Sequence, residues 1–214
     1  MTIDTKNMIS SILDSVSRID YIKPEDLPNI DLYMDQVTTF MESQLASSKR
    51  YPEDKILTKT MINNYAKNNL LPSPEKKRYS KEHLLMLIFI YYFKNILSIS
   101  DIQTLLGPIT EKYFKSTGEK DLTYIYNEVF SMEHSRIEYL KKDLLKSYHT
   151  AQNTFEDADE EDKEFLRNFS FICLLSFDVY LKKMLIEHLI DDMRPEKPAG
   201  KRHKEKPPKA PKEK

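Results

Sequence analysis

The sequence predicts an all-α fold, and three observations support this prediction. Only three of the 214 residues are glycine, so few positions favour the positive φ angles that tight turns require. Apolar residues recur three and four positions apart in several segments, which is the spacing of a helix with one buried face. A serine or threonine stands before several of these segments, where its oxygen can accept a free backbone N–H at a helix start.

The first two helices are predicted at residues 5–18 and from Asn29 or Asp31 to about Leu45. A linker that contains two prolines separates them, because proline lacks an N–H and restricts the residue before it. The second helix has an apolar side, which consists of Leu32, Val37, Phe40, Met41 and Leu45.

A helix, a basic loop and an apolar helix follow. Thr58 or Thr60 is the expected cap of the first helix, and Ser80 is the expected cap of the second. Asparagines and prolines after residue 67 end the first helix, whose inward residues are Met61, Ile62 and Tyr65. The loop between the helices carries three consecutive basic residues, Lys76, Lys77 and Arg78.

A short helix is predicted after this pair. Ser98 and Asp101 have the spacing of a capping box, in which two side chains bond the first turn of a helix, with an acid in place of the usual Glu. Gly107 and Pro108 are expected to close the helix, since glycine is common just after a helix end and proline shortly beyond it.

The carboxy-terminal part is predicted to form two long helices, at residues 122–149 and 165–193, joined by an acidic loop at 152–162. The second is apolar nearly all round, which is typical of a helix that is central to its fold or lies at an interface. Cys173 within it is expected to be a small core residue. Residues 194–214 contain five prolines and no large apolar residue, so we expect a disordered basic tail.

Several short motifs occur in a fixed order in the middle of the chain. They are Tyr65, then Leu70, Leu71 and Pro72, then Lys76, Lys77 and Arg78, then Tyr79 and Ser80, then Ser98, Ile99, Ser100, Asp101, Ile102, Leu105 and Leu106. This order resembles the winged helix-turn-helix of MerR-type transcription regulators, in which a recognition helix precedes a basic wing. The whole sequence also resembles an uncharacterised bacterial family known only as a domain of unknown function, which implies no activity.

Three features depart from the MerR-type pattern. Asn63 and Asn64 stand where that family usually has an arginine and a tyrosine, so its arginine contact to phosphate is absent here. Ile96 stands where glycine is usual. Residues 47–57 separate the two candidate helices, whereas a DNA-binding helix-turn-helix has a turn of about 3–4 residues.

Charge is segregated along the chain although the formal net charge is only −1. Residues 49–94 carry ten basic and four acidic residues, and residues 194–214 carry nine basic and three acidic ones. Each stretch therefore has a net charge of +6, which leaves −13 on the remainder. Such a distribution can steer a polyanion to one surface, although lysine-rich loops and tails also simply keep helical proteins soluble.

The MerR-type resemblance implies a DNA-binding transcription regulator that contacts double-stranded DNA. Side chains facing the major groove would be Lys59, Asn63, Asn64 and Lys67, and asparagine can pair with adenine edges. Tyr65 would brace the helix or touch the DNA backbone. Phosphate contacts would come from Lys76, Lys77 and Arg78 on the wing, and from Lys49 and Arg50 in the preceding loop.

Four segments are expected: an amino-terminal helix and linker at 1–28, a winged-helix region at 29–107, a helical region at 108–193 and the tail at 194–214. The apolar stripes of the two long helices allow either an intramolecular bundle or a homodimer.

The sequence also excludes several classes of protein. A single cysteine excludes an internal disulfide, and no run of about 18 apolar residues or signal-peptide pattern occurs, so we expect a cytoplasmic protein outside the membrane. No catalytic motif, metal site or cofactor site is expected, and no effector is indicated. The alternative to the regulator is a protein–protein interaction module on a relic winged-helix scaffold.

Overall fold

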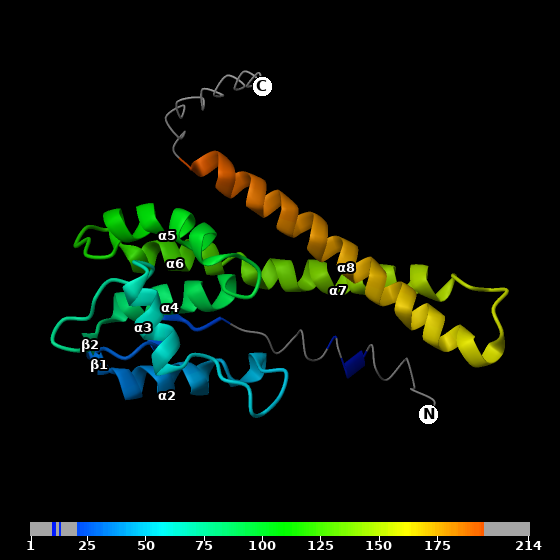
Figure 1. Cartoon of the computed structure of the whole chain (residues 1–214), viewed down its shortest axis with the longest axis horizontal. Coiled ribbons are helices and arrows are strands. Elements are labelled where there is room, and N and C mark those ends of the chain that lie inside the picture. Colours follow the sequence, from blue (N-terminus) through cyan, green and yellow to red (C-terminus); the bar gives the residue numbers. More distant parts are fainter. Residues whose placement is uncertain (1–9, 12, 14–20, 195–214) are drawn as a thin grey trace, which may run out of the picture.

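A computed structural model describes Ser10, Ser11, Leu13 and residues 21–194 (Figure 1). Helices predominate in this part of the chain, so the all-α fold class is confirmed, with a short two-stranded sheet added to it. The helix predicted at 5–18 and the tail predicted at 194–214 lie largely outside the described residues. In chain order the elements are η1 (Pro24–Asp26), β1 (Leu32–Tyr33), α2 (Met34–Gln44), η2 (Ala46–Ser48), α3 (Lys59–Lys67), β2 (Arg78–Tyr79), α4 (Lys81–Phe93), α5 (Ile99–Tyr113), α6 (Leu122–Phe130), α7 (Glu133–Gln152) and α8 (Glu160–Met193).

The core is built around α4. Every residue from 83 to 91 is buried, so this helix must be covered on all sides. Side chains from the surrounding helices complete the cluster, and they include Val37, Met41, Ile62, Ile102, Leu106 and Tyr126. The Tyr126 hydroxyl donates a hydrogen bond of 2.7 Å to the Ile22 carbonyl, which holds the start of the described chain against α6.

The strand before α2 corrects the predicted helix start at Asn29 or Asp31. Leu32 and Tyr33 instead form β1, which pairs antiparallel with β2 through Leu32 with Tyr79 and Tyr33 with Arg78. Helix α2 therefore begins only at Met34. The partner strand of β1 begins 46 residues further along the chain. The residues around Leu32 therefore do not by themselves predict a strand there.

Helix α5 corrects a second prediction, because it continues through Gly107 and Pro108 to Tyr113. A proline inside a helix removes one backbone hydrogen bond. Here apolar side chains beyond it, Ile109 and Tyr113, pack partly buried against the core, and Phe114 is buried. This packing outweighs the local preference for ending the helix, as it does for most helices in proteins.

The long helix predicted at 122–149 is two helices, α6 and α7, separated at Ser131 and Met132. The Asp121 side chain caps α6 by accepting the Tyr124 N–H at 2.8 Å. Helix α8 begins at Glu160, before the predicted residue 165, so three acids of the predicted loop lie in its first turn. That position is favourable, because a helix amino end carries partial positive charge.

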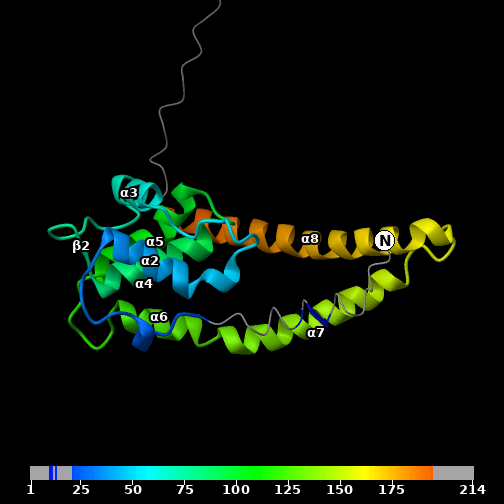
Figure 2. The ribbon, with the colours of Figure 1, turned by 90° about the horizontal axis from the view of Figure 1, so that it is seen from below.

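Helices α7 and α8 form a hairpin that extends from the helical body (Figures 1 and 2). A small cluster of Leu144, Ala151 and Phe171 joins them, and the rings of Tyr148 and Phe171 meet edge to face at 5.7 Å. The far end of α8 returns to the body, where Ile190 is buried and Arg194 pairs with Asp101 of α5. None of the helices in the described residues has the length and apolar character needed to cross a membrane.

Candidate nucleic-acid interface

Helix α3 is fixed by a cap and by two buried side chains. The Thr58 hydroxyl oxygen accepts the Met61 N–H at 3.2 Å, as predicted for one of the two candidate threonines. Ile62 is fully buried, and Tyr65 is only 8% exposed. Of the two roles expected for Tyr65, bracing the helix is the one that its buried position fits.

The opposite face of α3 is polar and lies in solvent. Its exposed residues include the four predicted groove-facing side chains, Lys59, Asn63, Asn64 and Lys67. No acidic residue occurs in α3. Lys59 forms an exposed ion pair with Asp35 of α2, which joins the two helices at this surface. Exposed pairs of this kind contribute roughly 0–1 kcal/mol, so Lys59 can exchange this partner for another anion at low cost.

The end of α3 directs the chain toward the basic loop. Asn69 has a positive φ of 55°, and the Leu70 N–H donates to the Tyr65 carbonyl at 2.9 Å. Asparagine tolerates this left-handed conformation better than most residues. Leu70 and Leu71 then enter the core, so the helix end and the start of the loop are both anchored.

The basic loop closes with a tight turn from Glu75 to Arg78, where the Arg78 N–H donates to the Glu75 carbonyl at 2.8 Å. Lys76 and Lys77 occupy its two central positions with φ angles of 49° and 66°. A side chain with a β-carbon costs about 1–2 kcal/mol in this region, which is why Asn-Gly is preferred in such turns. The chain thus keeps two exposed lysines at the tip of the turn although glycine would fit it better.

Two contacts hold the basic turn in place. The Arg78 guanidinium lies over the Tyr33 ring at 5.5 Å, and β1 carries that ring. The Glu75 carboxylate pairs with Lys115 at 2.7 Å, just after α5. Both views show α3 and the turn at the same end of the molecule, away from the loop between α7 and α8 (Figures 1 and 2).

Three other basic residues of the 49–94 stretch are engaged elsewhere. Lys49 pairs with Glu42 and is mostly buried, and this contact holds the pKa of Glu42 below its usual value. Arg50 lies over the Tyr51 ring at 5.2 Å, in a loop that extends away from the basic turn (Figure 2). The Lys94 ammonium donates to the Ile56 carbonyl at 2.8 Å, and burial lowers its pKa. These contacts tie Lys49 to α2 and Arg50 to its own loop, so the structure gives neither residue a contact with the basic turn.

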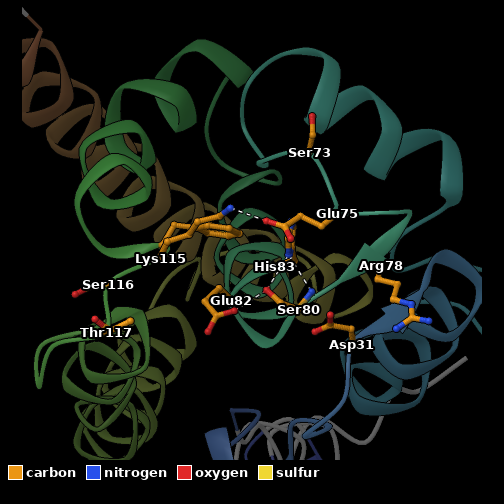
Figure 3. Close-up of a pocket in the computed structure, with 11 residues that line it drawn as sticks. Asp31, Ser73, Glu75, Arg78, Ser80, Glu82, His83, Lys115, Ser116 and Thr117 are labelled. Carbon is orange, nitrogen blue, oxygen red and sulfur yellow. Dashed lines mark hydrogen bonds and ion pairs between the residues drawn. The ribbon is translucent and has the colours of Figure 1, made fainter.

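A cavity of about 320 Å³ lies at the base of the basic turn (Figure 3). The turn, the start of α4 and the residues after α5 enclose it, and its charged lining residues are Asp31, Glu75, Arg78, Glu82 and Lys115. No group of three or more His, Cys, Asp and Glu side chains suited to a metal ion occurs among the described residues.

His83 forms the inner wall of this cavity and is 4% exposed. Its Nδ1 accepts the Ser80 N–H at 3.0 Å, so His83 completes the capping box of α4. Its ring lies edge to face between Tyr79 at 5.4 Å and Phe114 at 4.8 Å. Sequence reasoning missed this role, although the spacing from Ser80 to His83 is that of a capping box with histidine in place of Glu.

Burial is the main cause that lowers the pKa of His83 below its ordinary value. The carboxylate of Glu82 and the nearby backbone of Pro72 and Ser73 raise the pKa of His83 and so partly offset the effect of burial. Neither backbone group forms a hydrogen bond of full geometry with Nε2. A neutral ring that accepts at Nδ1 carries its proton on Nε2. Protonation of Nδ1 would remove the acceptor for the Ser80 N–H and so disrupt the start of α4.

We expect the free energy of unfolding to fall as the pH drops below about 6.5, the ordinary pKa of histidine, because the unfolded chain then binds a proton that folded His83 resists. His83→Gln keeps an acceptor for the cap without titrating, and it should reduce this fall. Urea denaturation at pH values from 5 to 8 measures the effect. His149→Gln, at an exposed position, is the control, and equal pH dependence in all three proteins would contradict the prediction.

The part of the chain that matches a known protein family is the part that forms the main core. The family described as domain of unknown function (DUF1836) matches residues 22–129, about half of the chain. The core cluster spans Ile22 to Tyr126, with Ile190 added from α8, so the match covers the body and leaves out α7 and α8. Neither a curated protein nor a solved structure matches the chain. The resemblance to MerR-type regulators stays a prediction, whereas the expected membership of a domain-of-unknown-function family is confirmed: the chain belongs to the DUF1836 family.

Proposed function

We propose that this protein is a DNA-binding transcription regulator without catalytic activity, and that it binds double-stranded DNA through a winged helix-turn-helix resembling that of MerR-type proteins. The observation that carries the proposal is the pairing of β1 with β2. This pairing holds a turn with Lys76, Lys77 and Arg78 beside a helix whose exposed face lacks acidic residues. A cytoplasmic location follows from this role.

The two parts of the surface suit different components of DNA. The turn offers three positive charges that can contact the negatively charged phosphates. Phosphate contacts position a protein on DNA without reading its sequence. Helix α3 offers Asn63 and Asn64, whose amides have the donor and acceptor needed for the major-groove edge of adenine. Lys59 and Lys67 at the two ends of the helix would contact the flanking phosphates or guanine edges.

The test is binding of the purified protein to the DNA upstream of its own gene and to unrelated DNA, across a salt series. Sequence-selective binding whose log affinity falls linearly with log salt supports the proposal. Equal binding to both DNAs that disappears when residues 194–214 are deleted would mean that only the basic tail acts, and it would overturn the proposal.

Asn63→Ala combined with Asn64→Ala should reduce the preference for the selected DNA. A bidentate pair with a base contributes about 1–3 kcal/mol of discrimination, which corresponds to roughly 5–150-fold for each pair lost. Affinity for unrelated DNA and the salt slope should stay as in the wild type. Asn127→Ala, an exposed asparagine on α6, is the control. An unchanged preference in the double variant would exclude base reading by α3.

A second candidate is a protein–protein interaction module built on the same scaffold. The exposed apolar side chains of α8 favour it, because exposed apolar patches mark interaction sites. The long connection between α2 and α3, which buries Ile56 and Leu57, also differs from a DNA-binding turn of about 3–4 residues. Absence of selective DNA binding together with capture of a protein through α8 would favour the module.

A further inference from the structure

The cavity beneath the basic turn lies where three distant parts of the chain meet (Figure 3). They are the segment before β1, the turn with the start of α4, and the residues after α5. The pairing of β1 with β2 and the ion pair between Glu75 and Lys115 hold these parts together. The rings of His83 and Phe114, which are buried and meet edge to face, fix the floor. The cavity is therefore a preformed feature of the fold, as most ligand sites are.

The volume of the cavity limits its ligand to a small molecule. It measures about 320 Å³, which is the space that about ten water molecules occupy in liquid water. By the same measure, a ligand of roughly ten non-hydrogen atoms fits this space. That is the size of an amino acid or a small sugar, whereas a nucleotide is too large.

Two carboxylates of the cavity have no positive partner in the part of the chain that the structure describes. Asp31 and Glu82 both line the cavity and form no ion pair there, whereas Lys115 neutralises Glu75. Burial lowers the pKa of His83, and both carboxylates raise it, so both lie close to the ring that forms the floor. The cavity therefore offers two negatively charged acceptors to a positively charged group.

Arg78 supplies a cation with unused donors to the same cavity. Its guanidinium lies over the Tyr33 ring at 5.5 Å, and a contact with an aromatic face leaves the side-chain N–H groups available. Within the described residues, these N–H groups form no hydrogen bond or ion pair. A guanidinium can hold a carboxylate through two parallel hydrogen bonds, so Arg78 suits a ligand that carries this group.

The lining excludes several other classes of ligand. The described residues contain no group of His, Cys, Asp and Glu side chains suited to a metal ion. An anion alone is disfavoured, because three carboxylates outnumber the two cations Arg78 and Lys115. An apolar molecule would cover the charged groups without giving them partners, which costs free energy. A dipolar molecule with one ammonium and one carboxylate satisfies both kinds of group.

We propose that this cavity binds a free amino acid, whose ammonium group is held by Asp31 and Glu82 and whose carboxylate is held by Arg78. The site does not depend on DNA binding, and its tests contain no DNA, so either proposal can fail without the other.

The first measurement is isothermal titration calorimetry of the purified full chain with each common free amino acid, up to about 10 mM. We expect saturable binding at one site per chain for at least one of them. The matching amine lacks the carboxylate, and the matching carboxylic acid lacks the ammonium. Each should bind roughly 10–100-fold more weakly, because one charge-assisted contact is lost. No saturable binding of any amino acid, or equal binding of either analogue, would overturn the proposal.

Asp31→Asn combined with Glu82→Gln removes the two acceptor charges at nearly constant size. Affinity for the amino acid should fall roughly 10–100-fold, while the helical circular dichroism stays as in the wild type. The matched control is Glu156→Gln with Asp157→Asn, two exposed acids in the loop between α7 and α8. It removes the same two charges and should bind like the wild type. Equal affinities of the two double variants would contradict the assigned site.

Arg78→Lys separates the forked geometry of the guanidinium from its charge. Lysine cannot form two parallel bonds with one carboxylate, so affinity for the amino acid should fall roughly 10-fold. Affinity for the matching amine should change little, because this analogue has no carboxylate. A general loss of structure would weaken both, and equal losses would contradict the role of Arg78.

Nuclear magnetic resonance of the histidine rings tests the location of the site. The ring signals of His83, assigned with the variant His83→Gln, should shift when the amino acid binds, because this ring forms the cavity floor. Those of the exposed His149 on α7 should stay unchanged. Binding that leaves the His83 signals in place would put the ligand elsewhere and overturn the proposal.

Discussion

Replacing Lys76, Lys77 and Arg78 together with glutamine is expected to make the salt dependence of DNA binding shallower by about 2.7 in the log–log slope, because each phosphate contact contributes about 0.9. The loss of affinity should be roughly 40-fold greater at 50 mM than at 200 mM salt, which follows from the same slope. Glutamine keeps an unbranched polar side chain, although a shorter one, and leaves the positive φ angles of the turn equally strained, so the main change is the loss of charge. Fluorescence anisotropy with a labelled duplex at several salt concentrations measures both quantities.

The control for this variant removes the same charge elsewhere. Arg136, Lys142 and Lys146 are exposed and lie on α7, in the hairpin that extends from the helical body (Figure 1). Their joint replacement with glutamine should leave the slope nearly unchanged, because these residues do not face the same duplex. Equal losses in the two triple variants would mean that net charge alone attracts DNA, and the turn would then have no specific role.

Local chemistry made part of the site predictable from sequence. The caps at Thr58 and Ser98 depend on side-chain and backbone atoms within three residues, so their pattern is visible in the chain itself. The polar face of α3 was predictable for the same reason, since Ile62 and Tyr65 mark its buried side and thereby define the opposite one.

Contacts that form only in the folded chain account for what could not be predicted. Strand β1 exists only because Leu32 and Tyr33 meet residues 78 and 79, and Lys49 turns inward because Glu42 and the backbone of Pro52 receive its ammonium. The positive φ angles of Lys76 and Lys77 also contradict residue preference, because the tight turn that the Glu75–Arg78 bridge closes requires them. A count of glycines predicted few tight turns, and it could not indicate that lysines would form this one.

Leu87→Ala and Leu185→Ala should differ strongly in their effect on stability although the chemical change is identical. Leu87 of α4 is 0% exposed, whereas Leu185 of α8 is 61% exposed. Deleting a fully buried leucine side chain costs about 2–5 kcal/mol through lost burial and the cavity that remains. A substitution at an exposed position away from such features stays within about 0.5 kcal/mol. Both positions lie inside helices, so the difference in helix propensity between leucine and alanine cancels in the comparison.

Urea denaturation of the two variants, followed by circular dichroism, measures this contrast. The expected difference follows from the architecture, because α4 is the centre of the body while the second half of α8 touches the body mainly through Ile186 and Ile190. Similar losses in both variants would show that a further surface covers Leu185 in solution.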